Sequence, residues 1–267
     1  MDQNYAALRS AYIDLLRDTI INAIYEDPGM APLKPWQVLK RLSGETARVK
    51  GFDAAKRARG LDWPMVAHSM IGRKRMDNLI FAATEVLAHN VPGDFIETGV
   101  WRGGACILMR GILRAYGDMG RKVWVADSFE GLPKPNAAKY AADKGDAHYK
   151  NSLLAVSVEQ VQDNFRRYGL LDGQVGFLKG WFKDTLPGAP IDRLAILRLD
   201  GDMYESTMDA LRALYHKVSL GGFVIVDDYH AVPGCRKAVH DFMAAEYPTE
   251  PLTLQEIDGV GVFWQRA

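Results

Sequence analysis

The hydrophobic positions of this chain follow two different patterns, one before and one after residue 94. Residues 4–25 repeat apolar side chains at helical spacing, which predicts an amphipathic helix. A second helix is expected at about 70–90. Between them, residues 26–64 are rich in Pro, Lys, Arg and Gly, with one short helical stretch near 36–42, which indicates a connection or lid.

From residue 94 onward, short apolar runs alternate with amphipathic stretches. Strands are expected at 94–100, 122–129, 174–182, 193–202 and 221–229, with helices between them. The tail is typical of two short strands around the turn signal Asp258-Gly259. This alternation predicts an α/β fold with a mostly parallel seven-stranded sheet, helices on both faces and a C-terminal antiparallel hairpin.

A polar segment, 130–152, follows the second predicted strand. Insertions of this length in a compact domain are usually functional lids or disordered segments. The pattern therefore divides the chain into an N-terminal helical extension or lid, 1–66, and an α/β domain, 67–267, with 130–152 as a lid-like insertion.

Composition excludes several classes of partner. Lys+Arg and Asp+Glu both number 33, so no global field favours nucleic acid or an anionic membrane. The basic run 72–78 is expected to form a solvated helix face. Apolar segments are shorter than the ~18–20 residues of a membrane span, and the first residues lack a secretory layout. Cys106 and Cys235 support neither a disulfide framework nor a CxxC metal site, so the cytoplasm is the expected location.

The first predicted strand–helix turn, 97–105, carries glycines at 99, 103 and 104, which let the backbone approach a ligand closely. Its spacing is not that of a dinucleotide or phosphate loop, so a ligand without phosphates, held partly by Glu97, fits better. Asp127, at the end of the next strand, is spaced to meet ribose hydroxyls. Taken alone, each feature is equally typical of a structural turn.

Further acidic pairs stand at the ends of the fourth and fifth predicted strands. Neighbouring strands lie ~4.8 Å apart, so Asp200 is expected beside Asp227 and Asp228. Three like charges repel unless one is protonated or a cation intervenes, and oxygen-only ligands suit Mg²⁺. Aspartates after a strand are also ordinary turn residues, and that alternative stays open.

A resemblance to the macrocin O-methyltransferase (TylF/MycF/NovP-like) family is carried by the segments ETGVWRGG, VADSF, GWFKDTLP, LRLDGDMYEST and GGFVIVDDY. The similarity runs from 67–72 to 234–242, whereas residues 1–66 match only loosely. It implies a Rossmann-like class I methyltransferase fold. It also implies Mg²⁺-dependent transfer of a methyl group from S-adenosyl-L-methionine to a hydroxyl of a sugar or phenolic natural product.

The same resemblance implies roles for individual positions. The metal ligands would be Asp200, Asp227 and Asp228. The general base would be Asp202 or His148, and both stay open, because Met203 stands where related catechol-type enzymes carry a lysine. The positions that match contacts to the cofactor are Ser69, Met70, Glu97, Thr98, Gly99, Val100, Trp101, Asp127, Ser128, Gly180, Trp181 and Asp200.

Dimers are common in the family, so we expect a homodimer acting on a small-molecule hydroxyl acceptor, with no nucleic-acid or membrane partner. One alternative is a catalytically silent scaffold that binds S-adenosylmethionine or a nucleotide. A nicotinamide-dependent dehydrogenase is a second alternative, against which the missing G-x-G-x-x-G argues.

Overall fold

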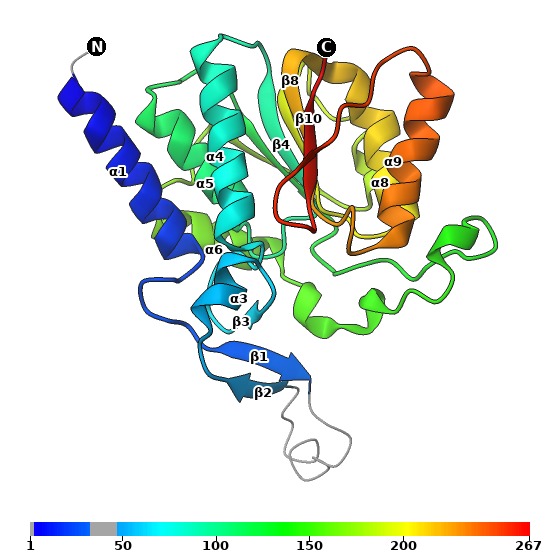
Figure 1. Ribbon diagram of the computed structural model, residues 1–267, viewed down its shortest axis with the longest axis horizontal. Helices are drawn as coiled ribbons and strands as arrows, with labels where there is room; N and C mark the ends of the chain where they lie inside the picture. The colour runs from blue at the N-terminus through cyan, green and yellow to red at the C-terminus, as the bar shows by residue number, and fades with distance from the viewer. Residues whose placement is uncertain (1–2, 33–46) are drawn as a thin grey trace.

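A seven-stranded sheet lies at the centre of the computed structural model, which describes residues 3–32 and 47–267 (Figure 1). Its strand order is β6-β5-β4-β7-β8-β10-β9, parallel from β6 to β8 and antiparallel at β10 and β9. The predicted sheet and C-terminal hairpin are confirmed. The strands are β4 (Asp94–Thr98), β5 (Val123–Asp127), β6 (Val175–Lys179), β7 (Leu194–Leu199), β8 (Val218–Val226), β9 (Gln255–Glu256) and β10 (Val262–Gln265).

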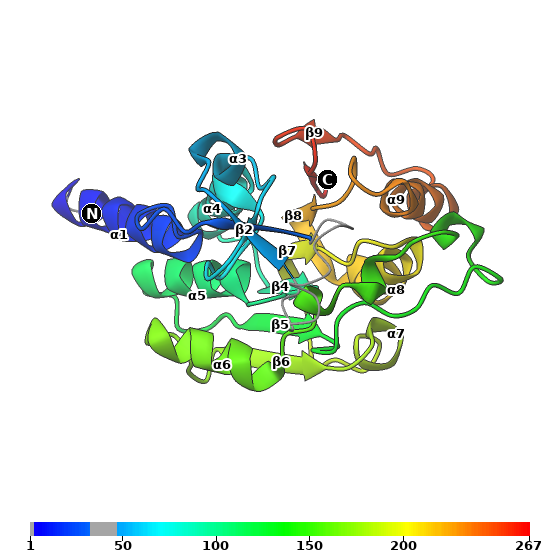
Figure 2. The ribbon, with the colours of Figure 1, turned by 90° about the horizontal axis from the view of Figure 1, so that it is seen from below.

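Helices cover both faces of this sheet, as Figure 2 shows with the strands between two helical layers. Neighbouring strand residues alternate between two cores because side chains point to opposite faces: Phe95 joins one core and Ile96 the other. The first layer holds α4 (Gly72–Ala88), α5 (Gly104–Ala115) and α6 (Val158–Arg167), and the second holds α7 (Phe182–Thr185), α8 (Tyr204–Leu214) and α9 (Pro233–Glu246).

Helix α1 (Gln3–Ile20) packs against α5 and α4 and ends earlier than the helix predicted over 4–25. Its buried side chains include Leu16, which lies so close to α5 that a Cβ on Gly111 would stand 2.1 Å from the leucine Cδ2. Leu8 and Leu15, on the expected apolar face, are 67% and 60% exposed. Only one stripe of α1 is buried, because it lies on the outside of the helical layer.

The chain before α4 contains a small antiparallel sheet, β2-β1-β3, beside α3 (Ala54–Ala58). Its strands are β1 (Gly29–Pro32), β2 (Ala47–Lys50) and β3 (Trp63–Pro64). We expected helices and a connection here and missed this sheet, because its strands are short and lack a clear alternation. The helical stretch expected near 36–42 lies outside the described residues.

The segment 47–71 is anchored by Arg57, which is only 1% exposed. Its guanidinium donates to the carbonyl oxygens of Ile21 (2.8 Å) and Asp27 (2.7 Å) and pairs with the carboxylate of Asp62.

Among the helices within the described ranges, none has the length and apolarity needed to cross a membrane.

Candidate active site

A cavity of about 600 Å³ opens where β4, β5, β6, β7 and β8 end. Such a volume suits a small-molecule ligand. Thr98 is a proposed site residue that does not line it: this side chain is buried, and its hydroxyl donates to the Arg198 carbonyl at 3.5 Å. The proposed residues that the fold brings together around the cavity are Ser69, Met70, Glu97, Gly99, Val100, Trp101, Asp127, Ser128, His148, Gly180, Trp181, Asp200, Asp202, Asp227 and Asp228.

The turn after β4 is built around Gly99, whose φ of +89° is a left-handed conformation. A Cβ on this glycine would lie 1.9 Å from the backbone oxygen of Asp200, so the turn presses directly against the end of β7. Asp127 holds the same turn: its carboxylate accepts N–H groups from Val100 (2.8 Å) and Phe129 (2.7 Å). Burial raises the pKa of Asp127, although these hydrogen bonds oppose the shift.

Asp200, Asp227 and Asp228 meet at the ends of β7 and β8, with one oxygen from each lying within 4.8 Å of the others. The neighbouring strands expected from the sequence are confirmed. Burial and then the charges of nearby aspartates raise the pKa of Asp200, and they raise that of Asp228 well above its usual range. The cluster therefore carries unfavourable negative charge.

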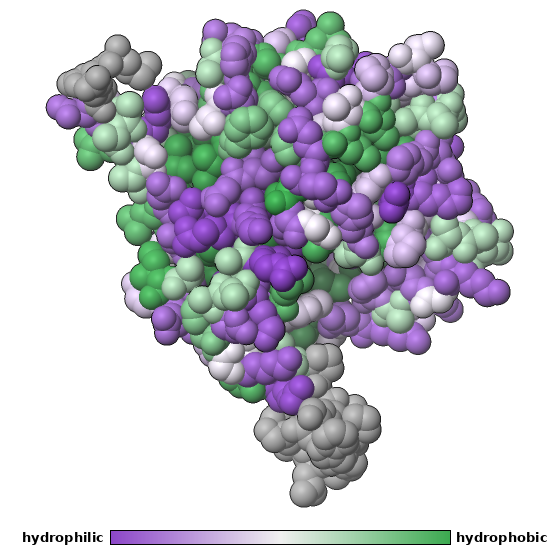
Figure 3. All heavy atoms as spheres, in the orientation of Figure 1, coloured by the Kyte–Doolittle hydropathy of each residue, from purple (hydrophilic) through white to green (hydrophobic). Residues whose placement is uncertain are grey.

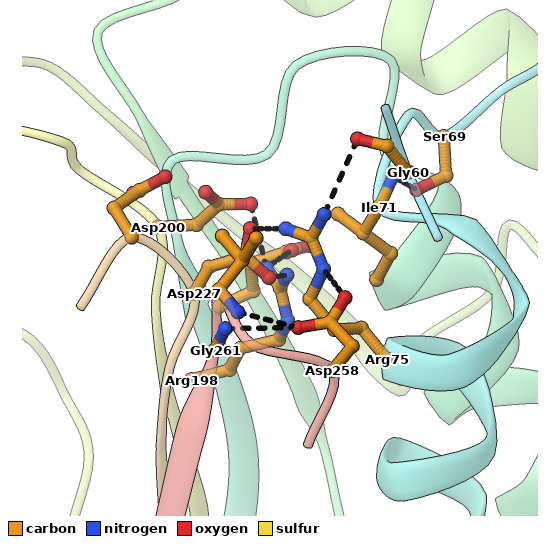
Figure 4. A network of polar contacts seen from close by, with 12 residues as sticks. Gly60, Ser69, Ile71, Arg75, Arg198, Asp200, Asp227, Asp258 and Gly261 are labelled. Carbon is orange, nitrogen blue, oxygen red and sulfur yellow. Dashed lines mark hydrogen bonds and ion pairs between the residues drawn. The ribbon is translucent and has the colours of Figure 1, made fainter. Parts of the chain in front are cut away.

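Two buried arginines compensate part of this charge (Figure 4). Arg198, 1% exposed, donates to Glu97, to Asp200 (2.7 Å) and to Asp227. Arg75 pairs with the other oxygen of Asp227, and the two guanidiniums thus hold that carboxylate from two sides.

Arg75 also binds the turn before β10, through Asp258 (3.0 Å), and the chain ahead of α4, through the Gly60 carbonyl (3.4 Å). The expectation that 72–78 forms a solvated face is wrong for Arg75, which is 7% exposed. A charge count along the helix could not distinguish this inward position from the outward ones, because the compensating carboxylates come from distant strands.

Glu97 lies beneath the cavity and is 2% exposed. Burial raises its pKa to about 7, against the opposing charge of Arg198. The Cys106 thiol donates to its second oxygen at 3.0 Å. Its carboxyl is thus fixed between a cation and a thiol at the floor of the cavity.

Both candidate bases line the cavity. Asp202 adopts φ +57°, which is rare for a residue other than glycine and marks a constrained position. Its N–H donates to Asp228 (3.2 Å), and burial together with Asp200 raises its pKa to about 7, against the opposing charge of His148. His148 Nδ1 lies 2.7 Å from the carboxylate of Asp146.

Helix α8, which follows this acidic turn, is capped from elsewhere. Asp143, in the 3-10 turn Ala141–Asp143 of the polar insertion, is 3% exposed and accepts the N–H groups of Tyr204 (2.7 Å) and Glu205 (3.0 Å). These are first-turn donors that a side chain must satisfy. The insertion is therefore anchored to the helix that begins beside Asp202.

Comparison with known proteins agrees with this architecture. A sequence profile described as Macrocin-O-methyltransferase (TylF) matches residues 9–266. The chain belongs to the macrocin O-methyltransferase family. Like other macrocin O-methyltransferases, it is an enzyme that transfers a methyl group from S-adenosylmethionine to a hydroxyl oxygen. The family and the O-methyltransferase activity predicted from sequence are confirmed.

Similar O-methyltransferases come from two species of Streptomyces. The chain is 54% identical to the 8-demethyl-8-(2,3-dimethoxy-alpha-L-rhamnosyl)-tetracenomycin-C 4'-O-methyltransferase of Streptomyces olivaceus, over 96% of this chain and 93% of that protein. It is 51% identical to the demethyldecarbamoylnovobiocin O-methyltransferase of Streptomyces niveus, over 96% and 94%. The solved structure of the O-methyltransferase NovP superposes with a TM-score of 0.86 at 50% identity, covering 97% of this chain and 99% of that chain.

Sequence reasoning missed three residues that shape this macrocin O-methyltransferase site: Arg75, Arg198 and Asp143. A signal existed only for Arg198, a charged residue inside the otherwise apolar run of β7, since a buried charge requires a partner. Arg75 and Asp143 stand in polar segments, where only the tertiary contacts mark them as buried.

Proposed function

We propose that this O-methyltransferase depends on Mg²⁺ and that Asp200, Asp227 and Asp228 hold the ion. The observation that carries the proposal is the convergence of three carboxylate oxygens within 4.8 Å inside the cavity that the glycine turn also lines. Asp228 makes no ion pair within the described ranges, whereas Asp227 is paired twice. A hard dication suits such an oxygen donor set, and bound there it would lower the pKa of the acceptor hydroxyl and orient it.

The charge around the cavity suits S-adenosylmethionine, whose sulfonium is cationic and supplies an activated methyl group. Among the residues that the structure describes, the basic side chains that line it are Arg75, Lys134 and Lys183, together with His148. The acidic side chains within the same described residues are more numerous: Glu97, Asp127, Asp200, Asp202, Glu205, Asp209, Asp227 and Asp228. We assign the turn at Gly99, with Glu97, to the methionine portion of the cofactor, and Asp127 to its ribose.

The chain's own residues would then align the reactants and remove a proton. Asp202 or His148 takes the proton of the acceptor hydroxyl, a role that asks for a group near the acceptor with a pKa not far from neutrality. The extension 1–66 and the insertion 130–152 act as lids, since Trp63 and Pro133 each line the cavity. Such lids exclude water and hold the acceptor.

The acceptor is a sugar or phenolic hydroxyl of a natural product. The support is the similarity to relatives whose names specify a rhamnosyl-tetracenomycin and a novobiocin precursor as their substrates. Aromatic and apolar residues of the cavity, namely Trp63, Trp101, Leu132, Pro133, Trp181 and Phe182, offer flat surfaces for a ring.

We also propose a homodimer and a cytoplasmic location. Along the edge formed by α1, Figure 3 shows hydrophobic atoms at the surface, and the exposed side chains there include Tyr5, Leu8 and Leu15. Apolar surface of this kind favours a protein partner. The two cysteines are free thiols, which suits a reducing compartment. Light scattering of the purified protein tests the dimer.

The function is tested with purified protein, S-adenosylmethionine and a panel of glycosylated and phenolic natural products, with either Mg²⁺ or EDTA. We expect S-adenosylhomocysteine and a singly methylated product, formed only with the divalent ion. Unchanged turnover in EDTA would exclude the metal while leaving methyl transfer intact. Binding of Mn²⁺, measured by calorimetry, should disappear when Asp200 and Asp228 are both replaced by Asn.

A further inference from the structure

Asp146 and His148 form a close pair inside the polar insertion. The Asp146 carboxylate clamps one residue with both oxygens: His148 Nδ1 lies 2.7 Å from Oδ2, and the His148 N–H donates to Oδ1 at 2.9 Å. The Asp146 side chain is only 10% exposed, whereas that of His148 is 46% exposed. An ionised carboxylate can only accept, so Nδ1 carries the proton and Nε2 is left with its lone pair.

The pair is held at a defined place. Asp143, which caps α8, accepts the N–H of Asp146 on its backbone oxygen at 3.1 Å. Asp202 lies two residues before the same helix. The insertion is thus docked where it brings His148 into the cavity, near Asp202.

A second histidine–carboxylate pair serves as an internal comparison. His230 Nε2 lies 2.6 Å from Glu256, which is 62% exposed, and neither residue lines the cavity in the described part of the chain. Pairing alone therefore does not distinguish Asp146. What distinguishes Asp146 is that the histidine it fixes lines the cavity.

We propose that Asp146 is a positioning residue for methyl transfer, holding His148 in the tautomer whose Nε2 receives the proton of the acceptor hydroxyl. This inference rests on the proposed function. As the acceptor O–C bond forms, the S–C bond of the sulfonium breaks and its electron pair stays on sulfur. The acceptor O–H bond breaks, its electron pair stays on oxygen, and the proton passes to Nε2 and later to solvent. Asp146 stabilises the imidazolium meanwhile.

The charged groups that face His148 agree with this role. Burial lowers the pKa of His148, but the hydrogen bond that the imidazole donates to Asp146 and the charge of Asp202 outweigh it and raise the pKa overall. A histidine so held can both accept a proton and keep it during the reaction.

The test compares Asp146→Asn, Asp146→Ala and His148→Gln, with Glu256→Gln as the matched control. With saturating cofactor and Mg²⁺, we expect kcat to fall by about 10–100-fold in the Asp146 variants, as for other groups that orient a reacting side chain. KM and cofactor affinity should be unchanged. The acidic limb of the kcat profile should move to lower pH, since the carboxylate that raises the histidine pKa is gone. Glu256→Gln should behave as wild type.

A second measurement reads the histidine without turnover. Nitrogen-15 NMR should show the Nδ1–H tautomer for His148 in the neutral wild-type protein and a mixture of tautomers in Asp146→Ala. Unchanged tautomer and kcat in Asp146→Ala would overturn the proposal. Full activity in His148→Gln together with loss in Asp202→Asn would overturn it too, while leaving methyl transfer established. If the wild type methylated no acceptor, the proposed function would fail, and the NMR result would still decide whether Asp146 sets the tautomer.

Discussion

Asp127 and Asp228 both follow buried strands of one sheet and line one cavity, yet their carboxylates meet different surroundings. Both oxygens of Asp127 accept backbone N–H groups, from Val100 and Phe129. Asp228 accepts one N–H, from Asp202, while burial, followed by the charges of nearby aspartates, raises its pKa well above the usual range.

The difference separates two uses of an acidic strand end. A carboxylate satisfied by backbone donors fixes a turn, and these hydrogen bonds offset part of the cost of burying its charge. Carboxylates that repel one another store unfavourable energy, which a bound cation releases. Gly99 joins the two regions, since its turn touches the backbone of Asp200.

The largest effect is expected from Asp228→Asn at the repelling end. Loss of a charged metal ligand should reduce kcat by about three orders of magnitude, because metal assistance is worth several kcal/mol and each ~1.4 kcal/mol is tenfold. In EDTA, the melting temperature of the variant should be equal to or higher than that of the wild type, since a repelling charge is removed. Activity assays and thermal melts check both, with the exposed Asp163→Asn as control; a wild-type rate would show that the cluster does not serve catalysis.

Gly99→Ala should damage both regions together. The new Cβ would lie 1.9 Å from the Asp200 oxygen, at φ +89°. We expect a loss of more than about 3 kcal/mol in the free energy of unfolding, measured by urea denaturation.

Gly117→Ala is the matched control for that variant. Gly117 also has a positive φ, +69°, but a Cβ there would meet no atom within 4 Å. Its cost should be limited to about 1–2 kcal/mol of backbone strain. Equal losses in the two variants would show that the contact with β7 is unimportant.

Asp127→Asn should weaken cofactor binding without removing the metal. An amide cannot accept with both ends, so one of two backbone N–H groups loses its partner. The cofactor Kd should rise about 10–100-fold, as expected for a charged hydrogen bond of ~1.5–3 kcal/mol. Calorimetry with S-adenosylhomocysteine checks this value, and Mn²⁺ binding should be unaffected; weaker Mn²⁺ binding would mean that the two ends are not separable.

The smallest effect concerns pH at the cofactor end, where the His68 carbonyl accepts the N–H of Gly104 at 3.0 Å. Burial, with nearby Arg167 and Arg102, lowers the pKa of His68 to about 4, and its Nδ1 lies 2.7 Å from the Tyr168 hydroxyl. Between these two pKa values, from about 4 to 6.5, His68 therefore binds a proton in the unfolded chain but not in the folded protein. Stability from this site is complete above pH ~6.5 and is lost as the pH falls toward 4.

The loss should amount to about 1–2 kcal/mol after allowance for solvent screening. Urea denaturation of the wild type and of His68→Gln at both ends of that pH range measures it. The wild type should lose more stability on acidification than the variant. An equal loss of unfolding free energy in both proteins would show that groups other than His68 cause the acid sensitivity.

The central fold was largely predictable from the sequence because the residue patterns of its strands and helices are local, each lying within one short segment. Short continuous apolar runs in β4 to β8, with helical spacing between them, follow from burial on both faces of a parallel sheet. The adjacency of β7 and β8 then brought three aspartates together, as expected. The sheet β2-β1-β3 was not predicted, because its short strands show no clear residue pattern and only their pairing in the folded chain identifies them.

The sequence by itself determined the strands of the central sheet, the acidic ends of those strands and the family. The tertiary structure alone decided which charges are buried together. Arg75 reaches Asp227 from a helix far away in the chain, and Asp143 caps α8 from the insertion, although the turn before α8 has aspartates of its own. These are long-range contacts between polar residues, and polar residues carry no periodic signal. Only the packed chain shows which of them lose water and must find partners.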